Sequence, residues 1–268
     1  MNTINFLAPR GNLISVTIAG DGPTMILLHG FPLDHRQWLP QLRHLSAYYR
    51  VIVPELRGFG RSTLTEQDYS IAELAEDVEQ VRLHFAPEQT IVLGGLSMGG
   101  YVALEYWRQF APRLSGLILA NTKPDADAPA AREARLEMVQ RAQRSGSWAA
   151  VSGMLPKLLT AENLSARAEI FNAVESMLQS CSVAAVTHAQ TAMAERQDFI
   201  HHLPAITTPT LVLTGEQDSI APPEATRKWA AVIPNSTCHV LPPAAHLTPL
   251  EAADEFNQRV HEFVQHLS

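Results

Sequence analysis

The sequence places a serine between two glycines in the stretch Gly95-Leu96-Ser97-Met98-Gly99. Residues 90–93 before it have strand character, and a helix-compatible run, 101–110, follows it. A strand that turns directly into a helix around a serine brings backbone segments too close for a β-carbon, which explains the two glycines. Such a turn exposes the hydroxyl near the unpaired N–H groups of the helix N-terminus. The pattern predicts a nucleophilic serine; the alternative is a serine that only caps the helix.

A serine hydroxyl attacks a carbonyl carbon at neutral pH when a base takes its proton and an acid orients that base. His246 follows a strand-like run near the C-terminus, and Asp218 follows another, just before a Pro-Pro helix start. We therefore expect Ser97 as the nucleophile, His246 as the base and Asp218 as the acid. Glu216 and Asp198 are the alternatives for the acid.

These residues lie at the ends of strand-like segments that alternate with helical ones. The strand-like segments are Thr3–Phe6, Asn12–Ala19, Thr24–Leu28, Val51–Val53, 90–93, Leu117–Ala120, Thr210–Leu213 and Thr237–Leu241. The helical segments between and after them are about 35–48, 70–85 (with a capping box at Ser70 and Glu73), 101–110, 223–233 and 250–266. The alternation predicts an α/β fold with a mostly parallel sheet flanked by helices. In such sheets ligands bind beyond the carboxyl ends of the strands, where the three candidate residues fall.

The alternation stops between residues 124 and 200, where we expect about four helices and no strand. Their expected limits are 129–144, 147–159, 166–179 and 183–196, with Thr160 and Ser182 as caps and Gly146 and Gly153 as breaks. We predict a helical cap of residues 124–200 inserted into a core of residues 1–123 and 201–268. Such a cap would cover the serine, and its candidate pocket walls are Trp148, Met154, Leu158 and Met177. For any one of these four, a place in the core of the cap is the alternative.

The composition is that of a soluble globular chain, with 46% hydrophobic and 18% charged residues among 268. The formal charge of -7 argues against nucleic acid or an anionic membrane as a partner. The two cysteines match no metal-site spacing. No apolar run reaches the ~18 residues of a membrane span, and the first residues lack the features of a signal peptide. We therefore expect a cytoplasmic protein.

Five motifs recur together in one known family. They are HGFP at 29–32, ELRGFGRS at 55–62, GLSMGG at 95–100, PTLVLTGEQD at 209–218 and AAH at 244–246. With them the chain resembles α/β-hydrolase-fold enzymes of the branch that includes 3-oxoadipate enol-lactonases, cofactor-free haloperoxidases (perhydrolases) and small carboxylesterases. The order serine, acid, histidine along the chain is also that of this family. The chain departs from the family at Ala245, where glycine is usual, and at Glu251-Ala252-Ala253, where a proline is often found.

The resemblance implies a serine hydrolase that cleaves small carboxylic esters or lactones through an acyl-enzyme, without metal or organic cofactor. The backbone N–H of Met98 should be one oxyanion donor, and by resemblance that of Phe31 the other. Pro32 is shared with perhydrolases and suggests a secondary perhydrolase activity. We expect His29 to hold this loop in place rather than to take part in catalysis.

Other functions use the same residues or the same fold. A C–C bond hydrolase has the same triad, and a ligand-binding or signalling protein can keep the fold without catalysis. Enzymes of this fold with an aspartate nucleophile are disfavoured by Ser97. The expected partner is a small-molecule ester or lactone, and the chain is expected to be a monomer or a homodimer.

Overall fold

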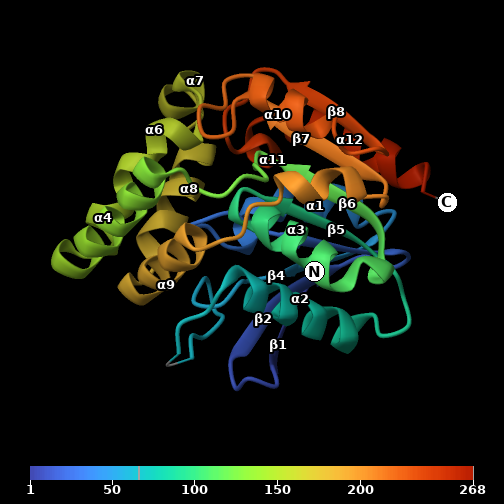
Figure 1. The fold of residues 1–268 in the computed structure, drawn as a ribbon, viewed down its shortest axis with the longest axis horizontal. Coiled ribbons are helices and arrows are strands. Elements are labelled where there is room, and N and C mark those ends of the chain that lie inside the picture. The colour runs from blue at the N-terminus through green and yellow to red at the C-terminus, as the bar shows by residue number, and fades with distance from the viewer. Residues whose placement is uncertain (66, 268) are drawn as a thin grey trace.

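The computed structural model describes residues 1–65 and 67–267; residues 66 and 268, which the predicted core ranges include, lie outside this part. Within it, eight strands form one sheet in the order β1-β2-β4-β3-β5-β6-β7-β8 (Figure 1). The strands are β1 Asn2–Leu7, β2 Leu13–Ala19, β3 Thr24–Leu28, β4 Arg50–Pro54, β5 Ile91–Leu96, β6 Leu114–Ala120, β7 Thr210–Gly215 and β8 Ser236–Leu241. Only the pairs β1–β2 and β2–β4 are antiparallel among these strands, so the predicted mostly parallel sheet is confirmed.

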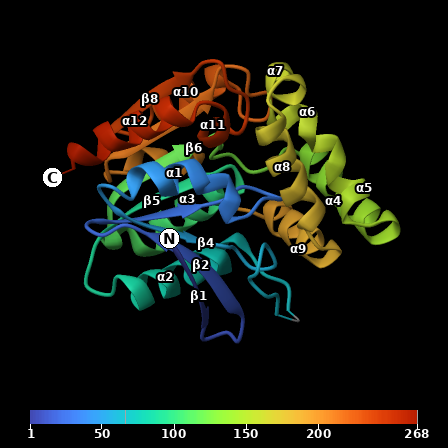
Figure 2. The same cartoon turned by 180° about the vertical axis from the view of Figure 1, so that it is seen from behind.

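The strands β3, β5 and β7 are buried along their whole length, because helices cover both faces of the sheet. The core helices are α1 Leu39–Leu45, α2 Ile71–Phe85, α3 Met98–Phe110, α10 Pro223–Ala230, α11 Thr248–Glu251 and α12 Ala253–Gln265. On one face α1 packs against α12, and on the other α2 packs against α3 (Figures 1 and 2). The capping box predicted for Ser70 and Glu73 begins α2.

Two helices predicted as continuous in the core are divided in the structure. The predicted helix 35–48 begins with a 3-10 turn, His35–Trp38, and continues as α1, because Pro40 cannot donate the hydrogen bond that would extend one α-helix through it. The predicted helix 250–266 is divided into α11 and α12 at Ala252, whose φ of -127° and ψ of 48° are not helical.

The chain between β6 and β7 is helical, as predicted, and lies to one side of the sheet (Figure 1, left). Its helices are α4 Pro129–Ser145, α5 Ser147–Val151, α6 Leu155–Leu158, α7 Ala161–Ser165, α8 Ala168–Ser180 and α9 Val183–Ala194. The single helix predicted for 147–159 is wrong: α5 and α6 are separated by a 3-10 turn, Ser152–Met154, because Gly153 and Pro156 both weaken an α-helix there. The short helix α7 was not predicted. Among all these described helices, none is both long and apolar enough to cross a bilayer.

Candidate active site

Ser97 stands at the turn between β5 and α3 with a backbone that few non-glycine residues adopt. Its φ is 55° and its ψ is -114°. A β-carbon on Gly95 would lie 2.0 Å from the carbonyl oxygen of Gly99, and one on Gly99 would lie 2.3 Å from that of Leu28. Only glycine fits at either position, so the chain can turn sharply enough to leave the Ser97 side chain half-buried, facing a cavity.

Asp218 and His246 follow the neighbouring strands β7 and β8 and are both buried. Oδ2 of Asp218 lies 2.9 Å from Nδ1 of His246. Oδ1 accepts hydrogen bonds from the N–H groups of Ile220 and Ala221, at 2.8 and 3.0 Å. Burial opposes ionisation of this carboxyl, but His246 and the hydrogen-bond donors outweigh it, so the pKa of Asp218 is lowered. Asp218 is therefore a carboxylate at neutral pH.

The ionised carboxylate fixes the tautomer of the imidazole. An acceptor at Nδ1 requires the proton on that nitrogen, which leaves the lone pair of His246 on Nε2. Ser97 and His246 line the same cavity, of about 170 Å³. Among the described residues, no hydrogen bond joins the Ser97 hydroxyl to this ring. The structure thus brings His246 and Asp218 into contact and places Ser97 on the same cavity wall.

The loop after β3 runs beside Ser97. A β-carbon on Gly30 would lie 3.3 Å from Cβ of Ser97, and Phe31 lines the cavity with it. The backbone N–H of Phe31, like that of Met98 at the first position of α3, donates no hydrogen bond to another described residue. Both N–H groups predicted to bind an oxyanion are therefore without a hydrogen-bond partner among the described residues.

His29 holds this loop in place. Its Nδ1 lies 3.0 Å from the carbonyl oxygen of Gly30, and its Nε2 accepts the N–H of Leu56 at 3.0 Å. The ring is fully buried, and that burial lowers the pKa of His29. Because His29 is neutral and both ring nitrogens have hydrogen-bond partners, it can hold the loop in place, which is the role expected from the sequence.

Asn121 and Thr248 form a hydrogen-bonded relay behind Asp218 that sequence analysis missed. Nδ2 of Asn121 donates to Oδ2 of Asp218 at 2.8 Å, and the Thr248 hydroxyl donates to Oδ1 of Asn121. Asn121 has a φ of 46°, a conformation that asparagine tolerates better than most residues. Its position directly after a buried strand was the one available sequence signal.

Glu251, one of the departures from the family pattern, supports the loop that carries His246. Oε2 accepts the N–H of Ala245 at 2.8 Å. Oε1 accepts the N–H of Thr160 and Nδ2 of Asn163, both at 2.7 Å. This buried carboxylate therefore joins the histidine loop to the helical segment.

The two alternatives for the acid lie elsewhere. Glu216 is exposed, and Asp198 accepts the N–H groups of Ala126 and Ile200, as a loop-capping aspartate does. Neither has a hydrogen bond to His246 among the described residues.

Of the four candidate pocket walls, Met154 lines the cavity with Ser97, whereas the other three are absent from its described lining. Leu158 and Met177 are buried in the core of the helical segment, and Trp148 is 39% exposed. Their helical spacing did not distinguish a pocket wall from cap core or surface. The missed wall residues from the helical segment are Ala134, Arg135, Met138, Gln190 and Met193.

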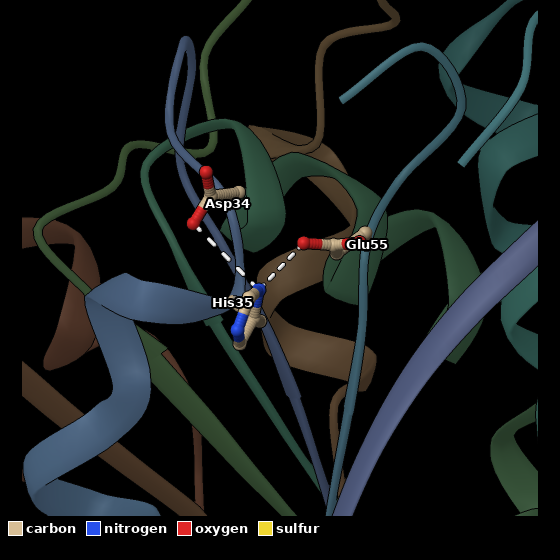
Figure 3. A group of neighbouring side chains, drawn as sticks. All are labelled: Asp34, His35 and Glu55. Atoms are coloured by element: carbon tan, nitrogen blue, oxygen red, sulfur yellow. Dashed lines mark hydrogen bonds and ion pairs between the residues drawn. The ribbon is translucent and has the colours of Figure 1, made fainter. Parts of the chain in front are cut away.

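Asp34, His35 and Glu55 form a compact group of ligand-type side chains near the same loop (Figure 3). Nδ1 of His35 lies 2.5 Å from Glu55 and 3.8 Å from Asp34. The other oxygen of Glu55 accepts the N–H of Arg61 at 2.8 Å, and both oxygens of Asp34 accept hydrogen bonds from Arg36. Because the carboxylates are already paired with cations and Nδ1 donates, the group fits a loop brace better than a metal site.

Comparison with known proteins agrees with this architecture. The family model described as alpha/beta hydrolase fold matches residues 23–253. A pimeloyl-[acyl-carrier protein] methyl ester esterase of Yersinia enterocolitica is 30% identical over 92% of this chain and 96% of its own. The proline iminopeptidase PfmaB of Pestalotiopsis fici is 26% identical over 98% of this chain and 99% of its own. A thermophilic esterase of Thermogutta terrifontis, solved with malate bound, has a TM-score of 0.95 and 36% identity, covering 100% of this chain and 99% of that one.

Proposed function

Because the chain belongs to the α/β-hydrolase fold family, we propose that it is a serine hydrolase of small carboxylic esters or lactones. Ser97 is the nucleophile, His246 the base and Asp218 the acid of this proposal. The observation that carries it is the hydrogen bond between Asp218 and Nδ1 of His246, beside the cavity that Ser97 and His246 line together. The esterase names of two relatives support the ester substrate.

The proposed reaction begins when Nε2 of His246 takes the Ser97 proton and the oxygen attacks the carbonyl carbon. In unliganded enzymes the nucleophile–base hydrogen bond is often long and shortens in the substrate complex. The backbone N–H groups of Phe31 and Met98 stabilise the tetrahedral oxyanion. As this intermediate collapses, the protonated His246 gives its proton to the leaving alkoxide, and an acyl-enzyme remains. Water activated by His246 then releases the acid and regenerates Ser97.

The cavity limits the substrate of this reaction. At about 170 Å³, its volume favours small acyl and alcohol groups. Met138, Met154 and Met193 from the helical segment line it, and flexible thioether side chains adapt to different apolar groups. We propose that residues 124–200 act as a cap that sets the accepted size.

The test is turnover of p-nitrophenyl acetate and butyrate by the wild type and by Ser97→Ala. Loss of several orders of magnitude in kcat is expected for the variant, with unchanged folding by circular dichroism. Ser115→Ala, a change at a half-buried serine outside the site, is the matched control and should retain activity. Equal activity of Ser97→Ala and the wild type would exclude this mechanism.

Further substrates separate the alternatives. γ-Lactones and an enol-lactone test the cyclic esters, and proline p-nitroanilide tests the amide chemistry named for the Pestalotiopsis relative. A wild type that binds small carboxylic acids but turns over no ester, lactone or amide would favour a ligand receptor. Turnover of a vinylogous 1,5-diketone alone would favour a C–C bond hydrolase.

A secondary perhydrolase activity is also part of the proposal. Pro32 follows the proposed oxyanion donor Phe31, and its ring shapes the loop without offering an N–H. Leucine at this position has a backbone N–H and lacks the ring that restricts φ. The ratio of perhydrolysis to hydrolysis should fall in Pro32→Leu; an unchanged ratio would argue against the side activity.

A further inference from the structure

The cavity beside Ser97 is cationic in an acidic protein. The chain carries a formal charge of -7, yet the charged side chains among the described lining residues are Lys123 and Arg135, with no aspartate or glutamate. The other titratable side chains of the lining, His246 and Tyr101, carry no negative charge at neutral pH. The local charge therefore opposes that of the whole molecule.

Lys123 has no charge partner. It follows the end of β6 by three residues and is half-buried, and it also lines an adjoining cavity together with Tyr101, Glu105, Glu195 and Arg196. Within the described chain, its ammonium group has no hydrogen bond or ion pair. A lysine without a counter-ion at the wall of a cavity is available to bind an anionic ligand by charge and hydrogen bonds.

Arg135 is held in place but only partly neutralised. On α4, its Nε donates to the buried carboxylate of Asp127 and its Nη1 donates to Gln190 at 3.1 Å. Arg196 shares the same carboxylate, with Nη1 at 2.8 Å from Oδ1. Two guanidinium groups thus share one negative charge, while Nη2 of Arg135 donates to no other described residue.

Buried arginines elsewhere in the protein have a carboxylate each. Arg57 pairs with Asp77, and Arg82 pairs with Glu79. The shared carboxylate near the cavity is therefore a local feature, and it leaves an excess of positive charge at the wall of the cavity.

We propose that Lys123 and Arg135 select an ester or lactone that also carries a carboxylate, separated by a short chain from the reacting carbonyl. This inference rests on the proposed function, because it concerns the substrate of the same site. Lys123 supplies a point charge and Arg135 a directed N–H donor, which together suit a carboxylate. A singly charged carboxylate also costs less to desolvate than a phosphate dianion in a cavity whose apolar lining includes three methionines, Phe31 and Ile220.

The test compares two esters of matched shape. Monoethyl glutarate carries the carboxylate, and in ethyl 5-methylhexanoate an isopropyl group replaces it. The ratio of kcat/KM for the anionic to the neutral ester is measured by ethanol release, at low and high ionic strength. A ratio of about ten or more is expected for the wild type, as one charge-assisted hydrogen bond would give, and it should fall with added salt.

Variants assign the effect to the two residues. Lys123→Gln and Arg135→Gln should each lower the ratio severalfold, mainly through KM for the anionic ester. Arg132→Gln, at an exposed arginine of the same helix, should leave the ratio unchanged. If Arg135→Gln disturbs the cap, Lys123→Gln still decides the question.

The outcomes separate this inference from the proposed function. A wild type that hydrolyses the neutral ester through Ser97 but shows a ratio near one overturns the anionic selectivity alone. A ratio that is the same in Lys123→Gln and in the wild type also overturns the anionic selectivity alone. Failure to hydrolyse either ester, with no effect of Ser97→Ala, overturns the proposed function and this inference with it.

Discussion

The carboxylate of Glu251 accepts the backbone N–H of Ala245 at 2.8 Å, one residue before His246. The same side chain accepts the N–H of Thr160, and the N–H of His246 donates to the carbonyl of Leu158 at 3.2 Å. Both Thr160 and Leu158 belong to the helical segment. The loop that carries the proposed base is therefore fixed by the segment proposed to cover it, so that cap position and base position are coupled.

Glu251→Gln should lower both activity and stability. The amide keeps one acceptor oxygen but turns an NH₂ group toward N–H donors that the carboxylate now satisfies, which leaves at least one buried donor unpaired at a cost of about 1–3 kcal/mol. We expect kcat on p-nitrophenyl butyrate to fall about tenfold and the melting temperature to drop. Asp254→Asn, at an exposed position on α12, is the control. A Glu251→Gln enzyme with wild-type kcat would show that the loop is fixed without this carboxylate.

Asp218→Asn should reduce kcat by about 10³–10⁴, because the amide favours the imidazole tautomer with its proton on Nε2 and cannot stabilise the imidazolium. The effect should appear in kcat more than in KM, since Asp218 does not line the cavity beside Ser97. Steady-state kinetics on p-nitrophenyl butyrate measures both. Glu216→Gln, two residues earlier and exposed, should change neither constant. A comparable loss in that variant would reopen the identity of the acid.

Thr248→Val tests the relay behind Asp218. The valine removes the hydroxyl donor to Oδ1 of Asn121, so that Asn121 is held less firmly against the Asp218 carboxylate. We expect a loss of about 1 kcal/mol in stability and a severalfold lower kcat. Because Asn121 also contributes to the lowered pKa of Asp218, that pKa should rise in the variant, so that activity is lost at a higher pH on acidification. Thr248→Ser should restore both the rate and the profile, whereas a purely steric role of Thr248 would leave the serine variant impaired.

The turn around Ser97 could be predicted from sequence because the residues that determine it are local. Gly95 and Gly99 flank Ser97, and their contacts follow from the tightness of the turn itself. Asp218 and His246 could be placed because strand ends in a parallel sheet meet at one edge. Their contact is observed, and their catalytic roles stay predictions.

The residues that hold the site in place could not be found in this way. Thr248 and Asn121 are 127 positions apart, and Glu251 and Thr160 are 91 apart. No periodicity links residues at such distances, and a glutamate in a helical stretch usually indicates a solvated surface. The predicted helix 147–159 was wrong for a related reason: Gly153 was identified as a break, but apolar spacing continued across it and Pro156, and the two were kept in one helix.

Glu55 should make the protein sensitive to acid. Burial opposes its ionisation, but hydrogen bonds and charge from His35 and the N–H of Arg61 prevail and lower its pKa from 4.5 to about 2. A pKa lowered by folding stabilises the native state above the unfolded pKa, and that contribution is lost as pH falls through 4.5 toward 2. The shift corresponds to about 3 kcal/mol at neutral pH.

Glu55→Gln should therefore be less stable than the wild type at pH 6, and the difference should shrink as the pH approaches 2. Urea unfolding followed by tryptophan fluorescence between pH 6 and 2.5 measures this as a shallower slope of unfolding free energy against pH in the variant. Glu133→Gln, at an exposed glutamate on α4, should keep the slope of the wild type. If the Glu55→Gln and wild-type curves ran parallel down to pH 2.5, the low pKa assigned to Glu55, and with it the ionic character of the group in Figure 3, would be wrong.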